Sequence, residues 1–509
     1  MIIVLNFGSQ FAHLIARRVR DLGVKAEILP FNTDISQIKS LKPDGIIFSG
    51  GPASVINGGP LPPTKIFKLG IPILGICYGM QLMAQMNGGK VKKGKIKEYG
   101  RETIKINKNF KLFRGISDNQ TVWFSHGDYV AKTGLGFVPI ASSANCRVAG
   151  MSDEKLNLYA LQFHPEVAHT RNGNKIISNF LFNICKSEKD WRIPNLKETI
   201  IDSLKKDIGD GRVLIGISGG VDSLVAATFL YRAIGSQLHA VFVDTGLLRK
   251  NEVAEVLWSL KKLGFRNLIV EDAQSIFLKR LEGKIDPEEK RKVIGHTFIE
   301  VFEKAVKEKL GSHKIKFFAQ GTIYPDRIES AEPTKEASKI KSHHNLTLPK
   351  KFSFKLIEPL RDLYKDEVRK LGALLNLPKD LLDRHPFPGP GLAIRIVGDI
   401  TNERLAILRE ADSIYLDELR KYGEYDKIWQ AFAVLLTSKT VGVMGDERKY
   451  GYTISLRAVD SIDGMTADWH KMPADLLERI SSRITREVDE VTRVLYDITQ
   501  KPPATIEYE

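Results

Sequence analysis

The amino-acid sequence predicts an α/β protein with two open, mostly parallel α/β domains followed by a small α+β domain. In two successive parts of the chain, short apolar runs alternate with amphipathic stretches, a pattern typical of βαβ units. A polar stretch with a proline at 186–196 and a Pro/Gly-rich stretch at 384–395 interrupt this alternation. We therefore expect domains at residues 1–190, 191–384 and 385–509.

Composition limits the class of protein. The length of 509 residues agrees with about three domains. No apolar run reaches the ~18 residues of a membrane span, and the N-terminus reads as a strand rather than a signal peptide. The 3 cysteines cannot make a disulfide framework. We therefore expect a cytoplasmic protein without a membrane partner.

The net charge of +15 admits two interpretations, a nucleic-acid surface or pockets for anionic small molecules. Lysines and arginines are scattered among acidic residues, and no arginine-rich arm is present. This distribution favours phosphate-bearing substrates over nucleic acid.

Individual elements follow from the pattern. In the first domain we expect a helix at 11–23 and strands at 2–7, 25–31, 44–51 and 71–77. In the second we expect strands at 212–220, 238–246, 266–273 and 314–322, and a loop in the polar, lysine-rich stretch 326–352.

The third domain is predicted to contain strands at 441–445 and 452–460 and one long amphipathic helix at about 475–497. It is too small to bury a large core alone, so we expect it to pack against a partner.

Cys77 lies between a predicted strand and a helix in the arrangement Gly-x-Cys-x-Gly. This is the cysteine form of a nucleophile elbow, in which glycines permit a sharp turn. The thiol would sit at a helix N-terminus, where the helix dipole stabilises a thiolate. The alternative is a cysteine that merely fills the core.

A nucleophilic cysteine needs a base, a group that orients the base, and donors for an oxyanion. The stretch LQFHPEV supplies His164 and Glu166, two residues apart on an extended segment. The amides of Gly51, in SGGPAS, and of Tyr78 are candidate oxyanion donors.

Five stretches together resemble the class I glutamine amidotransferase family: SGGPASV, GICYGMQ, EYGR, WFSHGDYV and LQFHPEVAHT. The resemblance implies that Cys77, His164 and Glu166 form a triad that releases ammonia from glutamine. It further implies that the amino-acid end of glutamine is held by Gln81, Ser125, His126, Gly127 and Asp128. Cys146 and Cys185 lack such a setting, and we interpret both as structural.

The stretch GISGGVDS follows a predicted strand and opens a helix, so its glycines expose amides that suit an anion. It lacks the lysine of a Walker loop. It resembles the pyrophosphate loop of N-type ATP pyrophosphatases, which implies ATP binding by Ser218, Gly219, Gly220, Val221, Asp222 and Ser223. By the same resemblance Val243 contacts adenine and Asp222 binds Mg²⁺.

Enzymes with this loop adenylate an acceptor molecule, and at this point two kinds of acceptor remain possible. One branch thiolates tRNA, which suits the positive charge but typically uses cysteines, and no cysteine follows Cys185. The fused ammonia source favours amination instead. A tRNA-modifying protein with a degenerate amidotransferase domain and a non-catalytic binding module remain as alternatives.

Further stretches resemble the glutamine-hydrolysing GMP synthase family over essentially the whole chain: DPEEKRKVIGHTFIEVF, AQGTIYPDRIES, KIKSHHN, EPLRDLYKDEVRKLG, RHPFPGPGLAIR, VGVMGD and KPPATIEYE. The resemblance implies that ATP and Mg²⁺ adenylate XMP and that ammonia displaces AMP to give GMP. It also implies a homodimer formed through the C-terminal domain.

The same resemblance assigns further residues. It implies a lid with Asp326, Glu329, Lys341, His343 and His344, and XMP contacts by Arg291, Asp446, Lys501, Ile506 and Glu507. PFPGPG, residues 386–391, is expected close to the nucleotide. Arg327 and residues 345–352 depart from the family pattern in and beside this lid.

Overall fold

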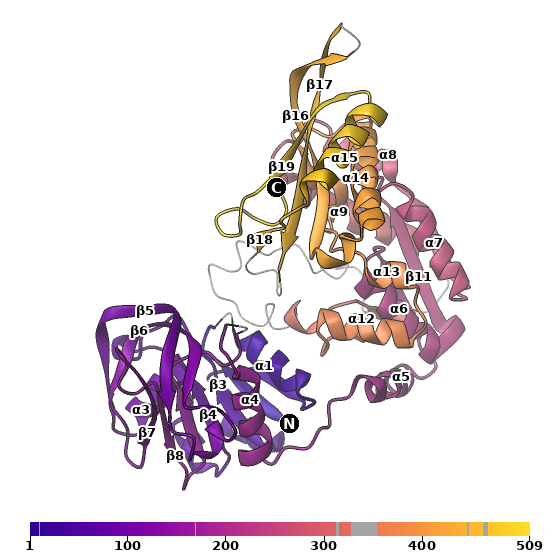
Figure 1. Cartoon of the computed structure of the whole chain (residues 1–509). Helices are drawn as coiled ribbons and strands as arrows, with labels where there is room; N and C mark the ends of the chain where they lie inside the picture. The colour runs from indigo at the N-terminus through magenta and orange to yellow at the C-terminus, as the bar shows by residue number, and fades with distance from the viewer. Residues whose placement is uncertain (10, 168, 312–314, 327–353, 445–446, 462–466) are drawn as a thin grey trace. The chain divides into compact units, whose positions relative to one another are not determined.

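The computed structural model describes residues 1–9, 11–167, 169–311, 315–326, 354–444, 447–461 and 467–509 (Figure 1). The chain divides into two compact units, Met1–Arg192 and Ile193–Glu509. Across the described ranges, no helix combines the length and apolar character that crossing a bilayer requires. Six residues with predicted roles or departures lie outside the described residues: Arg327, Glu329, Lys341, His343, His344 and Asp446.

The first unit is built on one nine-stranded sheet of order β2-β1-β3-β4-β9-β8-β7-β5-β6. Its parallel half contains β1 (Ile2–Asn6), β2 (Ala26–Pro30), β3 (Gly45–Phe48), β4 (Ile73–Ile76) and β9 (Leu158–Leu161). β1, β3, β4 and β9 are buried along their whole length, as expected for parallel strands covered on both faces.

The other half of this sheet is antiparallel and departs from the predicted parallel pattern. It contains β5 (Lys90–Ile106), β6 (Asn119–Lys132), β7 (Val138–Ser143) and β8 (Gly150–Asp153). The helices of this unit are α1 (Ala12–Asp21), α2 (Ile35–Ser40), α3 (Tyr78–Met86), α4 (Gly173–Ser178) and a π-helical turn at Asn179–Ile184.

The second unit begins with a parallel five-stranded sheet of order β12-β11-β10-β13-β14. Its strands are β10 (Arg212–Ile217), β11 (Leu238–Asp244), β12 (Leu268–Asp272), β13 (Ile315–Ala319) and β14 (Lys355–Ile357). The helices are α5 (Ile193–Ile208), α6 (Val221–Ile234), α7 (Glu252–Lys262), α8 (Gln274–Leu281), α9 (Pro287–Leu310), α12 (Lys365–Leu374) and α13 (Lys379–Leu382).

The same unit carries a second, mixed sheet of order β15-β16-β17-β18, with β19 paired to β17. Its strands are β15 (Ile396–Val397), β16 (Gln430–Met444), β17 (Glu447–Asp460), β18 (Asp468–Trp469) and β19 (Val491–Asp497). With α14 (Asn402–Tyr422) and α15 (Ala474–Glu487) these strands form an α+β layer. One apolar cluster extends from Leu214 through α14 to Val491, so this layer packs on the preceding α/β sheet.

The prediction of one long helix at 475–497 is wrong. The helix α15 ends at Glu487, and Val491–Asp497 forms β19, which runs parallel to β17. The stretch VTRVLYD contains branched and aromatic residues, which favour a strand once a sheet edge is available. The apolar residues of this stretch happen to fall at helical spacing as well, which is why the sequence predicted a longer helix.

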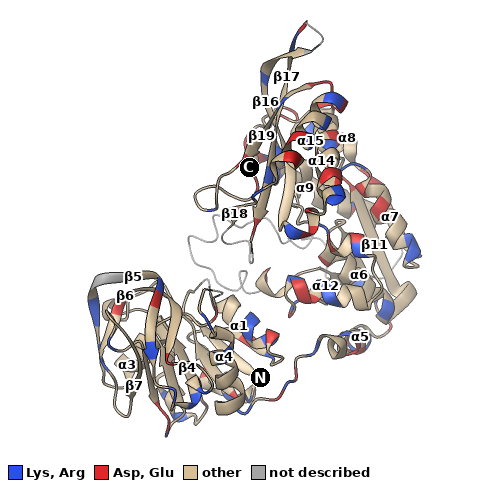
Figure 2. Cartoon of the chain, in the orientation of Figure 1, with Lys and Arg blue, Asp and Glu red and all other residues tan. Residues whose placement is uncertain are grey.

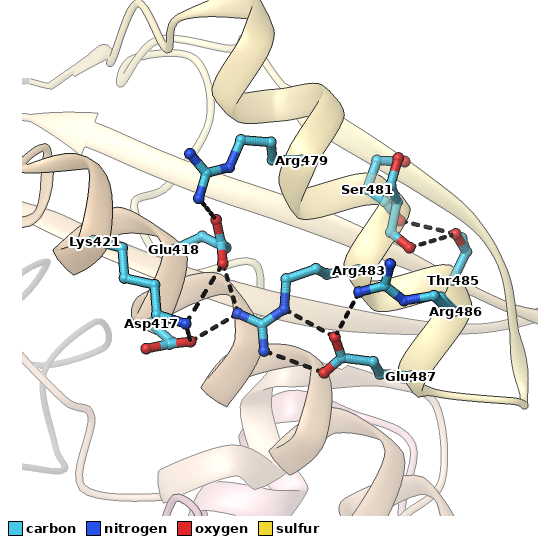
Figure 3. A network of polar contacts seen from close by, with 10 residues as sticks. Asp417, Glu418, Lys421, Arg479, Ser481, Arg483, Thr485, Arg486 and Glu487 are labelled. Carbon is cyan, nitrogen blue, oxygen red and sulfur yellow. Dashed lines mark hydrogen bonds and ion pairs between the residues drawn. The ribbon is translucent and has the colours of Figure 1, made fainter.

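An ion-pair network joins α14 to α15 (Figure 3). Arg483 Nη1 lies 2.7 Å from Asp417 Oδ2 and 2.6 Å from Glu418 Oε1, while its Nε lies 3.0 Å from Glu487 Oε1. Arg479 Nη2 adds a contact of 2.7 Å to Glu418 Oε2. Elsewhere on both units basic and acidic side chains are interspersed (Figure 2), as the sequence suggested.

Candidate active sites

Cys77 occupies a strained turn between β4 and α3. Its φ of 53° and ψ of −105° are unfavourable for a residue that carries a Cβ. The flanking glycines are needed for close packing, since a Cβ at Gly79 would lie 2.7 Å from the carbonyl oxygen of Phe48. The thiol is 6% exposed, and its Sγ lies 3.5 Å from the carbonyl oxygen of Ser125.

His164 and Glu166 form a buried pair after β9. Nδ1 of His164 lies 2.7 Å from Glu166 Oε1, and the two residues are 2% and 0% exposed. Burial alone lowers the pKa of His164, but the charge of Glu166 and contacts with Cys77 and Glu166 raise this pKa well above its usual value. The His164 imidazole is therefore suited to hold a proton at neutral pH.

The ring of His164 lies beside Cys77. A Cβ added to Gly50 would be 3.2 Å from Cε1 of His164 and 3.7 Å from Cβ of Cys77. The second ring nitrogen, Nε2, is buried and has no hydrogen-bond partner among the residues that the structure describes. Phe11 packs edge-on against the ring, with 5.3 Å between ring centroids. Nε2 is thus left for proton exchange with the thiol.

The two candidate oxyanion donors border the same turn. Tyr78 is the first residue of α3, so its amide belongs to those without a partner inside the helix. A Cβ at Gly51 would lie 2.6 Å from the carbonyl oxygen of Phe7, so glycine is required for this approach of two backbones. Gly51 follows Gly50, which lies against Cys77.

The segment Ser125–Asp128 on β6 lies next to the thiol, and Gln81 fixes it. Nε2 of Gln81, one turn into α3, donates to the carbonyl oxygen of Asp128 at 2.8 Å. Nδ1 of His126 contacts the same oxygen at 3.0 Å, and the hydroxyl of Ser54 donates to Asp128 Oδ2 at 2.5 Å. Gly127 completes this segment, which contacts the thiol through the carbonyl oxygen of Ser125.

A second candidate site lies where β10 passes into α6. The loop residue Gly219 has a φ of +84°, and Gly220 precedes the first helical residue, Val221. Ser223 closes the loop, because its hydroxyl donates to the carbonyl oxygen of Gly220 at 2.9 Å and lies 3.2 Å from the hydroxyl of Ser218. Amides at a helix N-terminus of this kind bind phosphate.

Asp222 carries both a lysine contact and an unpaired oxygen. Its Oδ2 lies 2.5 Å from Nζ of Lys365 on α12. Its Oδ1 is buried without a hydrogen-bond partner among the described residues. A carboxylate oxygen in this state is a suitable ligand for Mg²⁺. The sequence stretch LYKDEVRKLG contains Lys365, but spacing along the chain did not connect it with this loop.

The end of β11 forms the wall of the site next to the loop between β10 and α6. Val243 is buried, and the carboxylate of Asp244 accepts hydrogen bonds from the amide of Gly246 and from Nε2 of Gln274, both at 2.9 Å. The amide of Leu392, just after the PFPGPG stretch, donates to the carbonyl oxygen of Leu247 at 2.8 Å. The proline-rich stretch therefore lies against the loop that follows β11.

Arg291 lies beside the C-terminal tail. Its Nη2 donates to the main-chain oxygen of Glu509 at 2.6 Å, and Nζ of the buried Lys290 contacts Glu509 Oε2 at 2.6 Å. Of the predicted XMP contacts, Arg291 therefore lies beside the end of the C-terminal tail, and Lys501 pairs with Ala467 through an isolated β-bridge.

Glu507 is held by a residue that the sequence did not point to. Arg395 donates to both carboxylate oxygens of Glu507 at 3.1 Å, and Nε2 of Gln430 donates to Oε1 at 2.6 Å. Arg395 is fully buried. A buried arginine beside a proline-rich stretch has no distinctive sequence pattern. Asp326, the one described residue of the predicted lid set, accepts a hydrogen bond from the amide of Ile323 at 3.3 Å.

Comparison with known proteins agrees with this geometry. The family described as glutamine amidotransferase class-I matches residues 3–184, and the GMP synthase C terminal domain matches residues 417–508. A GMP synthase (glutamine-hydrolysing) from Carboxydothermus hydrogenoformans is 53% identical over 510 residues, which cover 100% of this chain and 99% of that protein. Proteins of the same name from Aquifex aeolicus and Bacillus cereus are 52% and 50% identical, with the same coverage.

Proposed function

The chain belongs to the family of glutamine-hydrolysing GMP synthases, and from this premise we propose how its residues carry out the reaction. Glutamine is hydrolysed to glutamate and ammonia at the Cys77 site. ATP adenylates a ring oxygen of XMP at the second site, and ammonia displaces AMP to give GMP, AMP and pyrophosphate. An adenylate is a good leaving group, whereas a ring oxygen alone leaves poorly.

Cys77 acts as the nucleophile in the first half-reaction. Its thiolate attacks the carboxamide carbon of glutamine, and His164 protonates the departing ammonia, so that a thioester remains. His164 then accepts a proton from water as the thioester is hydrolysed. The buried contact of 2.7 Å to Glu166 keeps the imidazole in one orientation and stabilises its protonated form.

The oxygen of the tetrahedral intermediate is stabilised by the amides of Gly51 and Tyr78. The glutamine amino-acid end binds to the segment Ser125–Asp128, which Gln81 holds in place through the carbonyl oxygen of Asp128. The carboxylate of Asp128 provides the charge that an ammonium group requires. This proposal rests on the close position of the segment to the thiol.

The loop Ser218–Ser223 binds the β- and γ-phosphates of ATP, and the main chain at Val243 contacts adenine. Asp222 would hold Mg²⁺, which neutralises charge on the departing pyrophosphate. Its unpaired Oδ1 fits that role. Lys365 adds a positive charge to a loop that has no lysine of its own.

XMP binds near Arg291 and the tail residues Lys501, Ile506 and Glu507, with Asp446 as a further contact. Asp326, Glu329, Lys341, His343 and His344 are proposed from the sequence to take part in the adenylation step; all but Asp326 lie outside the described residues. We further propose three domains, at 1–190, 191–384 and 385–509, a cytoplasmic location, and a homodimer formed through the C-terminal domain.

The observation that carries the proposal is the adjacency of a strained, buried Cys77 to the His164–Glu166 pair. Cys77→Ala is expected to abolish glutamine-dependent GMP formation and to leave formation from ammonium within about twofold of wild type. The assay follows loss of XMP absorbance with ATP and Mg²⁺. Cys185→Ala serves as the matched control and keeps both activities. Loss of ammonium-driven synthesis in Cys77→Ala would contradict the separation into two sites.

A further inference from the structure

Three buried side chains with metal-binding atoms meet in the first unit, outside the Cys77–His164–Glu166 triad. Glu98 on β5 and His126 on β6 are direct partners across two antiparallel strands, and Cys146 lies in the connection from β7 to β8. They are 6%, 7% and 0% exposed. One carboxylate oxygen, one ring nitrogen and one sulfur lie within 4.8 Å of one another.

His126 presents a free lone pair to this cluster. Its Nδ1 lies 3.0 Å from the carbonyl oxygen of Asp128, an acceptor, so the ring proton belongs on Nδ1. Nε2 is buried without a hydrogen-bond partner among the described residues. A histidine fixed through one nitrogen by a backbone carbonyl is the usual arrangement of a metal ligand.

The carboxylate of Glu98 faces this lone pair. Its Oε2 lies 3.1 Å from Nε2 of His126 without forming a hydrogen bond. Two acceptors at this distance repel each other unless a positive charge lies between them. A proton between the two atoms would remove the repulsion but would involve only Glu98 and His126. A metal ion would remove the repulsion and would also bind the sulfur of Cys146.

Cys146 supplies that sulfur. Its Sγ lies 3.3 Å from the carbonyl oxygen of Val148. The amide of Cys146 donates a hydrogen bond to the hydroxyl of Ser143 at 2.9 Å, which fixes the backbone at the cysteine. A bound divalent cation stabilises the thiolate form of such a cysteine directly.

We propose that Glu98, His126 and Cys146 bind one Zn²⁺ ion, with a fourth position left for water. Sulfur, imidazole and carboxylate are the ligands that zinc takes in proteins. Tetrahedral bonds to them require roughly 3.3–3.8 Å between ligand atoms. The 3.1 Å between Nε2 and Oε2 is close to this value, and because all three ligand atoms lie within 4.8 Å of one another, Sγ has to move by no more than about 1.5 Å.

The ion would fix the segment that borders the catalytic thiol. His126 follows Ser125, whose carbonyl oxygen lies 3.5 Å from Sγ of Cys77. The carbonyl oxygen of Asp128 joins His126 to Gln81. Zinc at this cluster would therefore fix the segment that contains His126, in addition to the hydrogen bond that Gln81 makes to it.

The test uses the full chain carrying Cys77→Ser, which removes the other thiolate able to bind metal in the first unit. Co²⁺ is titrated as a spectroscopic substitute for Zn²⁺, because a cobalt–thiolate bond gives an intense charge-transfer band. We expect one equivalent of Co²⁺ to produce this band and one equivalent of Zn²⁺ to remove it. Adding Cys146→Ser should abolish the band, whereas Cys185→Ser should retain it.

A second pair of variants tests whether Glu98 binds the metal directly or whether any acidic residue of this strand has the same effect. Glu98→Gln should weaken Zn²⁺ binding more than about tenfold, since loss of even an outer partner costs tenfold or more. Glu102→Gln, on the same strand, should leave the affinity within about threefold. Absence of the band at saturating Co²⁺, or a band that persists in Cys146→Ser, would overturn the proposal. An unchanged far-UV circular dichroism spectrum and an unchanged Tm of the first unit verify that each variant is folded.

Discussion

Glu166→Gln is the most direct test of the buried pair behind the catalytic thiol. The substitution keeps the size of the side chain and one acceptor oxygen but removes the negative charge. The contact of 2.7 Å from His164 Nδ1 to Glu166 Oε1 has the length of a charge-assisted hydrogen bond. Both residues are buried, so bulk salt screens the pair little.

The expected magnitude follows from the class of hydrogen bond. Bonds to a charged group contribute about 1.5–3 kcal/mol and neutral bonds about 0.5–1.5 kcal/mol, so the charge accounts for about 1–2 kcal/mol. If that stabilisation supports the protonated imidazole in the transition state, kcat/KM for glutamine falls about 5- to 30-fold. Glutamate release, measured with XMP and ATP present, gives this ratio.

A second readout concerns the proton itself. Because Glu166 raises the pKa of His164, removing the charge lowers that pKa, and less of the imidazole beside Cys77 is protonated at neutral pH. Alkylation of Cys77 by iodoacetamide should therefore slow near neutrality and recover only at higher pH. A kcat/KM within twofold of wild type together with an unchanged alkylation profile would refute the assigned role of Glu166.

Three other substitutions test separate parts of the chain. Gly51→Ala places a Cβ 2.6 Å from the carbonyl oxygen of Phe7, so displacement of this amide should lower glutaminase activity about 100-fold while ammonium-driven synthesis is retained. Lys365→Met removes the contact to Asp222 and should raise the KM for ATP about tenfold, measured by pyrophosphate release; an unchanged KM would exclude the contact from ATP binding. Arg483→Met breaks the network of Figure 3 and should lower the Tm by about 2–4 °C at neutral pH. The hydrogen bonds from Arg483 lower the pKa values of Asp417 and Glu487, that of Glu487 from 4.5 to about 2. The stabilisation is therefore complete above the usual carboxylate pKa and is lost as the pH falls toward the lowered one, so the Tm difference should vanish over that range. A Tm difference that does not change with pH would contradict this account.

The sequence predicted a site well where the reactive residues and the turn that positions them lie close together in the chain. The turn around Cys77 and the loop at 218–223 each combine a strand, glycines and a helix within about ten residues, so their positions follow from local rules. Prediction was poor for β5, KVKKGKIKEYGRETIKI, because lysines occupy most of its exposed face and leave no clear alternation. Its buried residues are few, among them Val91, Ile104 and Ile106.

Contacts between distant residues were not predictable from one sequence. Lys365 and Asp222 are 143 residues apart, and Arg395 and Glu507 are 112 residues apart. The wrong helix at 475–497 has the same cause, since only the presence of β17 makes a strand of 491–497 favourable. Local propensity cannot include a partner strand that the chain supplies elsewhere.

The distribution of thiols fits a chemical requirement of the two-site reaction. All 3 cysteines, Cys77, Cys146 and Cys185, precede residue 193, where the second unit begins. The adenylated purine formed in that unit is an electrophile, and a thiolate is a stronger nucleophile than ammonia at neutral pH. A cysteine beside the adenylate would therefore compete with ammonia for the ring carbon and trap the enzyme as a thioether. A second site without cysteine avoids that side reaction, and exclusion of water from the adenylate then decides the yield of GMP.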